Sequence, residues 1–166
     1  MKASNDKWLV VVNVFAASKK AGSVWKRAAV MMEQAGVPHA VMYTGGEDNA
    51  VAISRKASAA GYRKFVAVGG DGTVHDVLNG IAEYVYSDEA SGAVLSDFTL
   101  GVLPVGSGND WVKTTGVPRD VQGAVKVLAE GHTGMQDVVK VSILDRNDLN
   151  IVKTVSYMAN VGGSYG

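Results

Sequence analysis

Residues 64–73 read KFVAVGGDGT: a short strand-forming run passes directly into a loop of three glycines, one aspartate and one threonine. A helix is expected next, because apolar residues recur at helical spacing at Val74, Val77, Leu78, Ile81 and Val85. A buried strand that passes through glycines into a helix is typical of an open parallel sheet. This stretch therefore places the chain in the α/β class.

The same alternation of strand and helix extends to both sides. Strands are predicted at 8–14, 39–43 and 98–103, and helices at 23–35, 47–60 and 120–130. Thr44 and Glu47 have the spacing of a capping box for the second of these helices. Asp120 and Gly131 are suited to begin and end the last one. We expect a parallel sheet with flanking helices, of the Rossmann-like type.

The pattern changes near residue 134. Residues 135–144 and 151–160 are β-patterned, and a turn at 145–150 predicts an antiparallel hairpin. We therefore expect an α/β domain over 1–133 and, over 134–166, a hairpin that begins a second domain. The final residues do not resemble a finished terminus, so a truncated protein is expected.

Composition excludes several classes of protein. Lys and Arg together number 16, as do Asp and Glu, so the chain lacks the basic excess of a nucleic-acid binder. The absence of cysteine excludes disulfides, thiolate metal sites and cysteine nucleophiles. No apolar run approaches the ~18–20 residues that span a bilayer. We expect a cytoplasmic protein that meets any lipid from the membrane surface.

Two glycine-rich loops are expected at the carboxyl edge of the sheet, where open parallel sheets bind ligands. In the first, residues 69–73, glycine lets a phosphate approach the backbone and the following helix offers free N–H groups. The second, residues 106–110 (GSGND), repeats this design after the next strand. Each loop alone is equally compatible with a tight structural turn. The two together favour a nucleotide-phosphate site.

Asp71 suggests that the site also binds a metal ion. A carboxylate among phosphate-binding amides would repel the phosphate unless a metal ion or a transferable proton lies between them. A Mg²⁺ ion held by a carboxylate and by substrate phosphates meets that requirement. The residues therefore indicate a nucleotide-phosphate-binding domain with a metal-linked carboxylate, and they leave the acceptor open.

The two loops also carry a family resemblance. Residues 69–80 (GGDGTVHDVLNG) are similar to the signature of the diacylglycerol kinase catalytic family, which includes sphingosine kinases and bacterial lipid kinases. Residues 103–111 (LPVGSGNDW) resemble the second motif of that family. The resemblance extends from Asn13 to about residue 160. The GGDGT pentapeptide alone is shared with NAD kinases, whereas its combination with Asn79-Gly80 and the second loop is more specific.

The resemblance implies a two-domain enzyme that transfers the γ-phosphoryl of ATP to the hydroxyl of diacylglycerol or a related lipid, with Mg²⁺. An N-terminal α/β domain would bind ATP, and a C-terminal β-sandwich, missing here, would receive the lipid, so that this fragment alone would be inactive. Peripheral membrane contact and a homodimer are compatible with this scheme, and no nucleic-acid partner is expected. A kinase of the NAD-kinase type and a non-catalytic nucleotide-sensing module remain as alternatives.

Individual roles follow from the same resemblance. Asp71 would be the catalytic carboxylate, acting as a base or in the metal-linked network, directly or through water. The implied nucleotide-binding residues are Asn13, Gly69, Gly70, Gly72, Thr73, Gly106, Ser107, Gly108 and Asn109.

Overall fold

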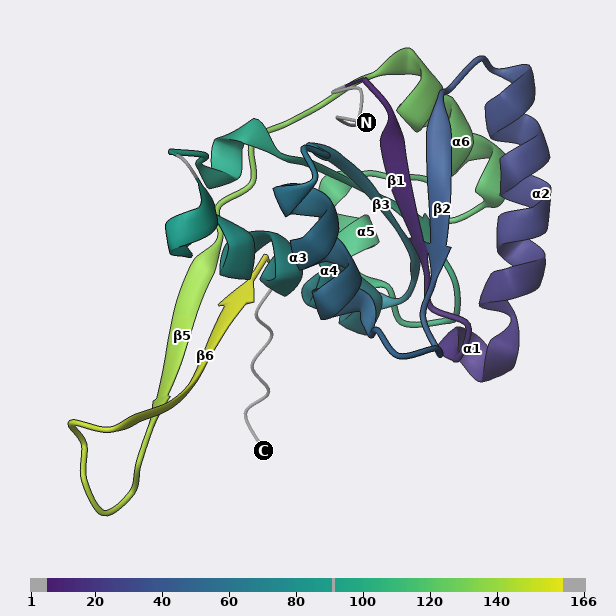
Figure 1. Cartoon of the computed structure of the whole chain (residues 1–166). Helices are drawn as coiled ribbons and strands as arrows, with labels where there is room; N and C mark the ends of the chain where they lie inside the picture. Colours follow the sequence, from purple (N-terminus) through teal and green to yellow (C-terminus); the bar gives the residue numbers. More distant parts are fainter. Residues whose placement is uncertain (1–5, 91, 160–166) are drawn as a thin grey trace.

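The computed structural model describes residues 6–90 and 92–159. It contains a four-stranded sheet with helices on both faces and a separate two-stranded hairpin (Figure 1). The expected unfinished terminus at 160–166 lies outside the described residues.

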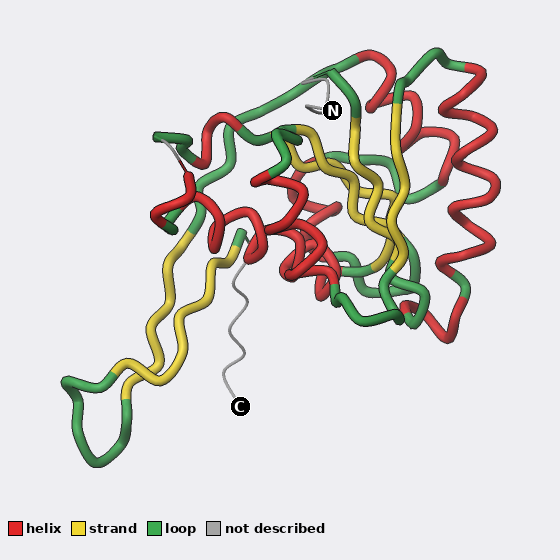
Figure 2. The backbone as a smooth tube through the Cα atoms, viewed as in Figure 1, coloured by secondary structure: helices red, strands yellow, loops and turns green. Residues whose placement is uncertain are grey.

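The elements alternate along the chain as predicted (Figure 2). The sheet strands are β1 (Trp8–Val12), β2 (His39–Tyr43), β3 (Lys64–Gly69) and β4 (Thr99–Pro104). The α-helices are α1 (Ala16–Lys19), α2 (Ala21–Gln34), α3 (Ala50–Ala59), α4 (Asp71–Val85), α5 (Asp110–Thr115) and α6 (Val121–Glu130). Two short 3₁₀ helices, η1 (Asp88–Ala90) and η2 (Leu95–Asp97), precede β4, and the hairpin consists of β5 (Val139–Leu144) and β6 (Val152–Met158).

The sheet is parallel throughout, with the strand order β2-β1-β3-β4. From β1 the chain leads to β2 on one side, and from β3 it leads to β4 on the other. The order therefore reverses between β1 and β3, which is where open α/β sheets bind their ligands. Val12 pairs with Val68, and Val68 pairs with Leu103, so these strands end close together.

Alternating side chains of each strand divide the core between the two faces of the sheet. Val10 and Val12 pack with residues of α2 and α6, whereas Leu9 and Val11 pack with residues of α3, α4 and α5. All five residues of β1 are buried. A strand that is covered on both faces reads as an uninterrupted apolar run, which is why the sequence indicated the fold class correctly.

The predicted capping box of Thr44 and Glu47 is wrong. Helix α3 begins at Ala50, and its N-cap is Asn49, whose side chain accepts a hydrogen bond from the Ala52 N–H at 2.9 Å. The caps of α6 are as predicted: Asp120 accepts from the Gly123 N–H at 2.8 Å, and Gly131 is left-handed with φ 69°. The short helices α1 and α5 were not predicted, because neither is long enough to show periodicity.

The hairpin is antiparallel as predicted, although β5 begins at Val139 rather than at 135. It extends away from the sheet and its helices (Figure 1). Several of its apolar side chains are exposed, among them Ile143 and Val152. Among the residues that the structure describes, no helix has the length and apolar character needed to cross a bilayer.

Candidate functional site

Asn13 lies just past β1, where the strand order reverses. Its backbone N–H donates to the Val68 carbonyl at 3.1 Å, which continues the β1–β3 pairing. Its side-chain Nδ2 donates to Thr73 Oγ1 at 3.1 Å, and its Oδ1 accepts from the Phe15 N–H at 3.1 Å. Asn13 therefore links the loop after β1 to the first turn of α4.

The first glycine-rich loop is shaped by contact between Gly69 and Thr73. A Cβ built at Gly69 would lie 2.7 Å from Thr73 Cβ, so no larger residue fits while Thr73 folds back over the end of β3. Thr73 is itself only 2% exposed. Gly70, the N-cap of α4, supplies no side-chain acceptor to the first turn. The Thr73 N–H already donates to the Gly70 carbonyl at 2.9 Å, so the N–H groups of Asp71 and Gly72 are the ones suited to an anionic ligand.

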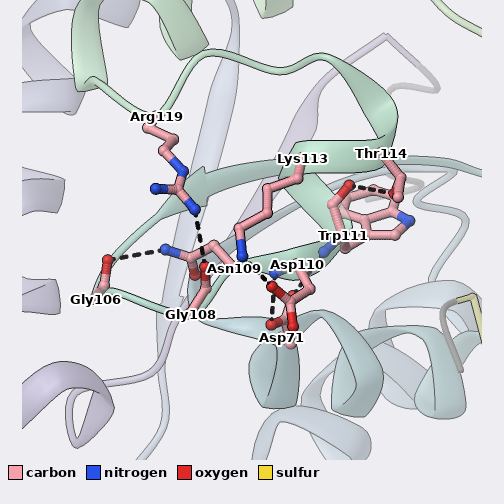
Figure 3. Close-up of polar contacts among 9 residues, drawn as sticks. All are labelled: Asp71, Gly106, Gly108, Asn109, Asp110, Trp111, Lys113, Thr114 and Arg119. Carbon is pink, nitrogen blue, oxygen red and sulfur yellow. Dashed lines mark hydrogen bonds and ion pairs between the residues drawn. The ribbon is translucent and has the colours of Figure 1, made fainter. Parts of the chain in front are cut away.

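Asp71 joins the two loops (Figure 3). Its Oδ2 accepts from the Asp110 N–H at 2.9 Å, and its Oδ1 accepts from the Trp111 N–H at 3.1 Å. These donors belong to the first turn of α5, whose N-cap Asn109 makes no side-chain capping bond. A carboxylate oxygen can accept more than one hydrogen bond or ligand bond, so Asp71 retains acceptor capacity for a cation.

The second loop is held by a hydrogen bond within it and by one from Arg119 (Figure 3). Asn109 is left-handed with φ 54°, is 5% exposed, and donates from Nδ2 to the Gly106 carbonyl at 3.0 Å. Arg119 donates to the Gly108 carbonyl at 3.2 Å. At the end of the loop, the Lys113 ammonium donates to Asp110 and holds the pKa of that carboxyl below its ordinary value.

The two loops and the segment after β1 border a cleft of about 990 Å³. Of the residues predicted from the sequence to form the site, all but Gly69 line it: Asn13, Gly70, Asp71, Gly72, Thr73, Gly106, Ser107, Gly108 and Asn109. Gly69 is buried behind Thr73, at the end of β3. The structure thus brings the predicted residues together around one cleft.

The segment after β1 adds a positive charge to this cleft. Lys20 lines the cleft together with residues 16–18. Ala17 and Ser18 have φ of 47° and 56°, a left-handed conformation that is uncommon for residues other than glycine. A cation at this position is suited to attract a polyphosphate.

Asp76 was not predicted, yet it lines both this cleft and an adjacent hollow of about 490 Å³. It follows Thr73 by three residues and so lies on the same side of α4, which is the sequence signal that would have identified it. Burial raises the pKa of the Asp76 carboxyl, and nearby His75 partly opposes that shift. Thr44, predicted as a helix cap, instead lines the smaller hollow, and its hydroxyl lies 3.5 Å from Asn13 Oδ1.

Two carboxylates, Asp71 and Asp76, therefore border the larger cleft. Within residues 6–90 and 92–159, no group of three or more His, Cys, Asp or Glu side chains could hold a metal ion. The pair of carboxylates, Asp71 and Asp76, suits an ion such as Mg²⁺, which is commonly held by one or two carboxylates together with phosphates of the substrate.

Comparison with known proteins places the chain in a family. The family model described as the diacylglycerol kinase catalytic domain matches residues 7–141. Proteins named diacylglycerol kinase from Staphylococcus aureus strains JH9 and Newman are each 32% identical over 115 residues, which are 69% of this chain and 33% of theirs. The chain thus spans about a third of the length of these relatives.

The fold has counterparts among solved structures. The crystal structure of a diacylglycerol kinase from Bacillus anthracis str. Sterne superimposes with a TM-score of 0.61 at 24% identity, covering 85% of this chain and 44% of that one. A structural match at that identity shows the fold alone. The family model, by contrast, matches most of the sequence and so shows the family. The chain belongs to the diacylglycerol kinase catalytic domain family.

Proposed function

We propose that this chain is the nucleotide-binding part of an ATP- and Mg²⁺-dependent lipid kinase that transfers the γ-phosphoryl of ATP to a lipid hydroxyl. One observation carries the proposal: two glycine-rich loops, joined through Asp71, border a cleft at the switch point of a parallel sheet. Amide-rich loops and a carboxylate suit phosphoryl transfer, which depends mainly on positioning and on charge stabilisation.

The nucleotide-binding roles are assigned by place in the cleft. The first-turn N–H groups of α4 and the second loop would contact the phosphates, with Lys20 as an attracting charge. Asn13 would orient the loop after β1 through its bond to Thr73.

The metal and the base are assigned to the carboxylates. Asp71 has acceptor capacity beyond its two amide bonds, and Asp76 offers a second carboxylate within the same cleft. Asp71 and Asp76 would hold a Mg²⁺ ion, which would supply charge neutralisation for phosphoryl transfer. Asp71 is also our candidate for accepting the proton of the lipid hydroxyl.

The proposal extends to the whole protein. Residues 1–133 would form the nucleotide-binding domain, and residues 134–166 would lead into a domain that receives diacylglycerol or a related lipid at the membrane surface, in a cytoplasmic enzyme. A homodimer is compatible with this arrangement. Because the chain spans about a third of its relatives, we expect the isolated chain to bind nucleotide without transferring phosphate.

The test is transfer of label from γ-labelled ATP, with Mg²⁺, to diacylglycerol, sphingoid bases and a total lipid extract, using the protein of the whole gene. NAD is included as a competing acceptor. We expect label in one lipid class and a loss of at least ~100-fold in Asp71→Asn. Label in NAD would favour the NAD-kinase alternative. ATP binding without transfer to any acceptor would favour a nucleotide-sensing module.

A further inference from the structure

Asn79 connects two parts of the molecule that lie far apart in the sequence. It is in α4, eight residues beyond Asp71, and is 9% exposed. Its Oδ1 accepts from the Tyr157 N–H at 2.8 Å, and its Nδ2 donates to the Tyr157 carbonyl at 2.9 Å. The same Nδ2 also lies 2.8 Å from the His75 carbonyl. A single side chain thus satisfies both backbone groups of a residue in β6.

The carboxamide acts here as a short substitute for a neighbouring strand. Tyr157 is paired with Lys140 of β5 on one side, and it presents its N–H and carbonyl to Asn79. Only a side chain with one donor and one acceptor at this reach can satisfy both groups. Aspartate lacks the donor, and glutamine is one methylene longer.

Other contacts gather at the same point. The Tyr157 ring is stacked on Tyr86 with centroids 5.1 Å apart, and it packs with Leu78 and Ala82 of α4. Ser156 Oγ lies 3.3 Å from His75 Nε2. By contrast, Ile143 and Val152 of the hairpin are 56% and 51% exposed. The hairpin is therefore anchored to α4 mainly through the end of β6.

We infer that Asn79 is a positioning residue, which fixes the register and direction of the β5–β6 hairpin on the helix whose first residue is Asp71. Eight residues of helix correspond to about 12 Å. A slip of β6 by one residue would turn Tyr157 away from α4 and break both bonds to Asn79. This inference rests on the proposed function: the Asn79–Tyr157 contact, called the clamp below, holds the hairpin in a defined position relative to the phosphate cleft and so would position the lipid-receiving part that we propose for the whole protein.

The inference is tested with Asn79→Asp, which keeps the shape and removes the donor, and with Asn79→Ser as a milder second variant. The control is Glu83→Gln, an exposed change one turn further along the same helix. Hydrogen exchange of residues 152–158 and ATP affinity are measured on the chain. The turnover number and the KM for lipid are measured on the protein of the whole gene, below the unfolding temperature of every variant.

We expect exchange in β6 to quicken by at least ~10-fold in the Asn79 variants and to stay unchanged in the control. ATP affinity should stay within about twofold of the wild type, because the clamp lies outside the cleft, while turnover on lipid falls by at least ~10-fold. That combination separates positioning from a general loss of fold, which would lower ATP affinity as well.

Unchanged exchange in both Asn79 variants would overturn the clamp. Faster exchange with normal turnover would overturn its role in positioning. If the wild type transfers no phosphate to any lipid, the proposed function fails, and with it the effect on turnover. The exchange measurement still decides whether Asn79 holds the hairpin.

Discussion

Replacing Asp71 with Asn should weaken the connection between the two loops as well as the chemistry. An aspartate oxygen accepts from each of the Asp110 and Trp111 N–H groups, at 2.9 and 3.1 Å. Asparagine has one acceptor oxygen, so one N–H loses its partner and faces an NH₂ group instead. Leaving such a donor unpaired costs about 1–3 kcal/mol, and water reaches the half-buried Asp71, so we expect a loss of about 1–2 kcal/mol.

Urea unfolding measures the loss in the free energy of unfolding. ATP binding in the presence of a chelator shows whether that loss arises because the second loop is no longer held. Without metal, removal of a carboxylate beside the phosphates would by itself strengthen ATP binding, because a like charge has been removed. If Asp71 holds the second loop in place, affinity should instead fall, by up to about 5- to 30-fold for 1–2 kcal/mol.

The matched control is Asp76→Asn, which makes the same change in the same helix where burial already disfavours the charge. The control should not lose stability. Undiminished ATP affinity in Asp71→Asn, together with an unchanged free energy of unfolding, would refute the linking role and leave Asp71 with chemistry alone.

Two further predictions concern α4. Gly80→Ala should lower the free energy of unfolding by about 1–3 kcal/mol, because the added Cβ would lie 2.8 Å from Ser54 Cβ and would collide with the Val51 carbonyl of α3. Thermal melting checks this prediction. The control is Gly22→Ala in α2, where nothing lies within 4 Å of the added Cβ, and it should be neutral or stabilising. Asp76 should make stability depend on pH: its folded pKa is raised above the ordinary value of 3.8, so the folded state keeps the proton longer and the free energy of unfolding falls as pH rises from 3.8 through the folded pKa. Asp76→Asn removes that decline, so its stability relative to the wild type should increase with pH across this window in urea titrations, and parallel curves for the two proteins would contradict the assignment.

The fold class and most of the cleft could be predicted from the sequence because both depend on local patterns. Strands buried on both faces appear as apolar runs, as in β1, and glycine-rich loops after β3 and β4 mark the carboxyl edge of the sheet. Once strands are parallel, their carboxyl ends meet at one edge. The convergence of Asn13, Thr73 and the second loop on one cleft follows from that fact alone.

The cap of α3 shows where local pattern was insufficient. Thr44 and Glu47 have capping-box spacing, but the chain bends over residues 44–47 and the helix starts after Asn49. The spacing predicted one helix start, and the path of the chain beyond β2 places the start three residues later than residue 47.

What the tertiary structure alone decided is the partner of each polar residue. The sequence marks Asp71 as a carboxylate in a phosphate-binding loop, yet its bonds to Asp110 and Trp111 join residues about 40 positions apart. The sequence likewise marks Asn79-Gly80 as a family motif, but it does not show what these two residues do. In the folded chain Asn79 binds β6, while Gly80 allows close contact with α3. Periodicity reports which face of an element is buried, whereas the hydrogen-bond partner of a buried polar group depends on which distant segment packs against it.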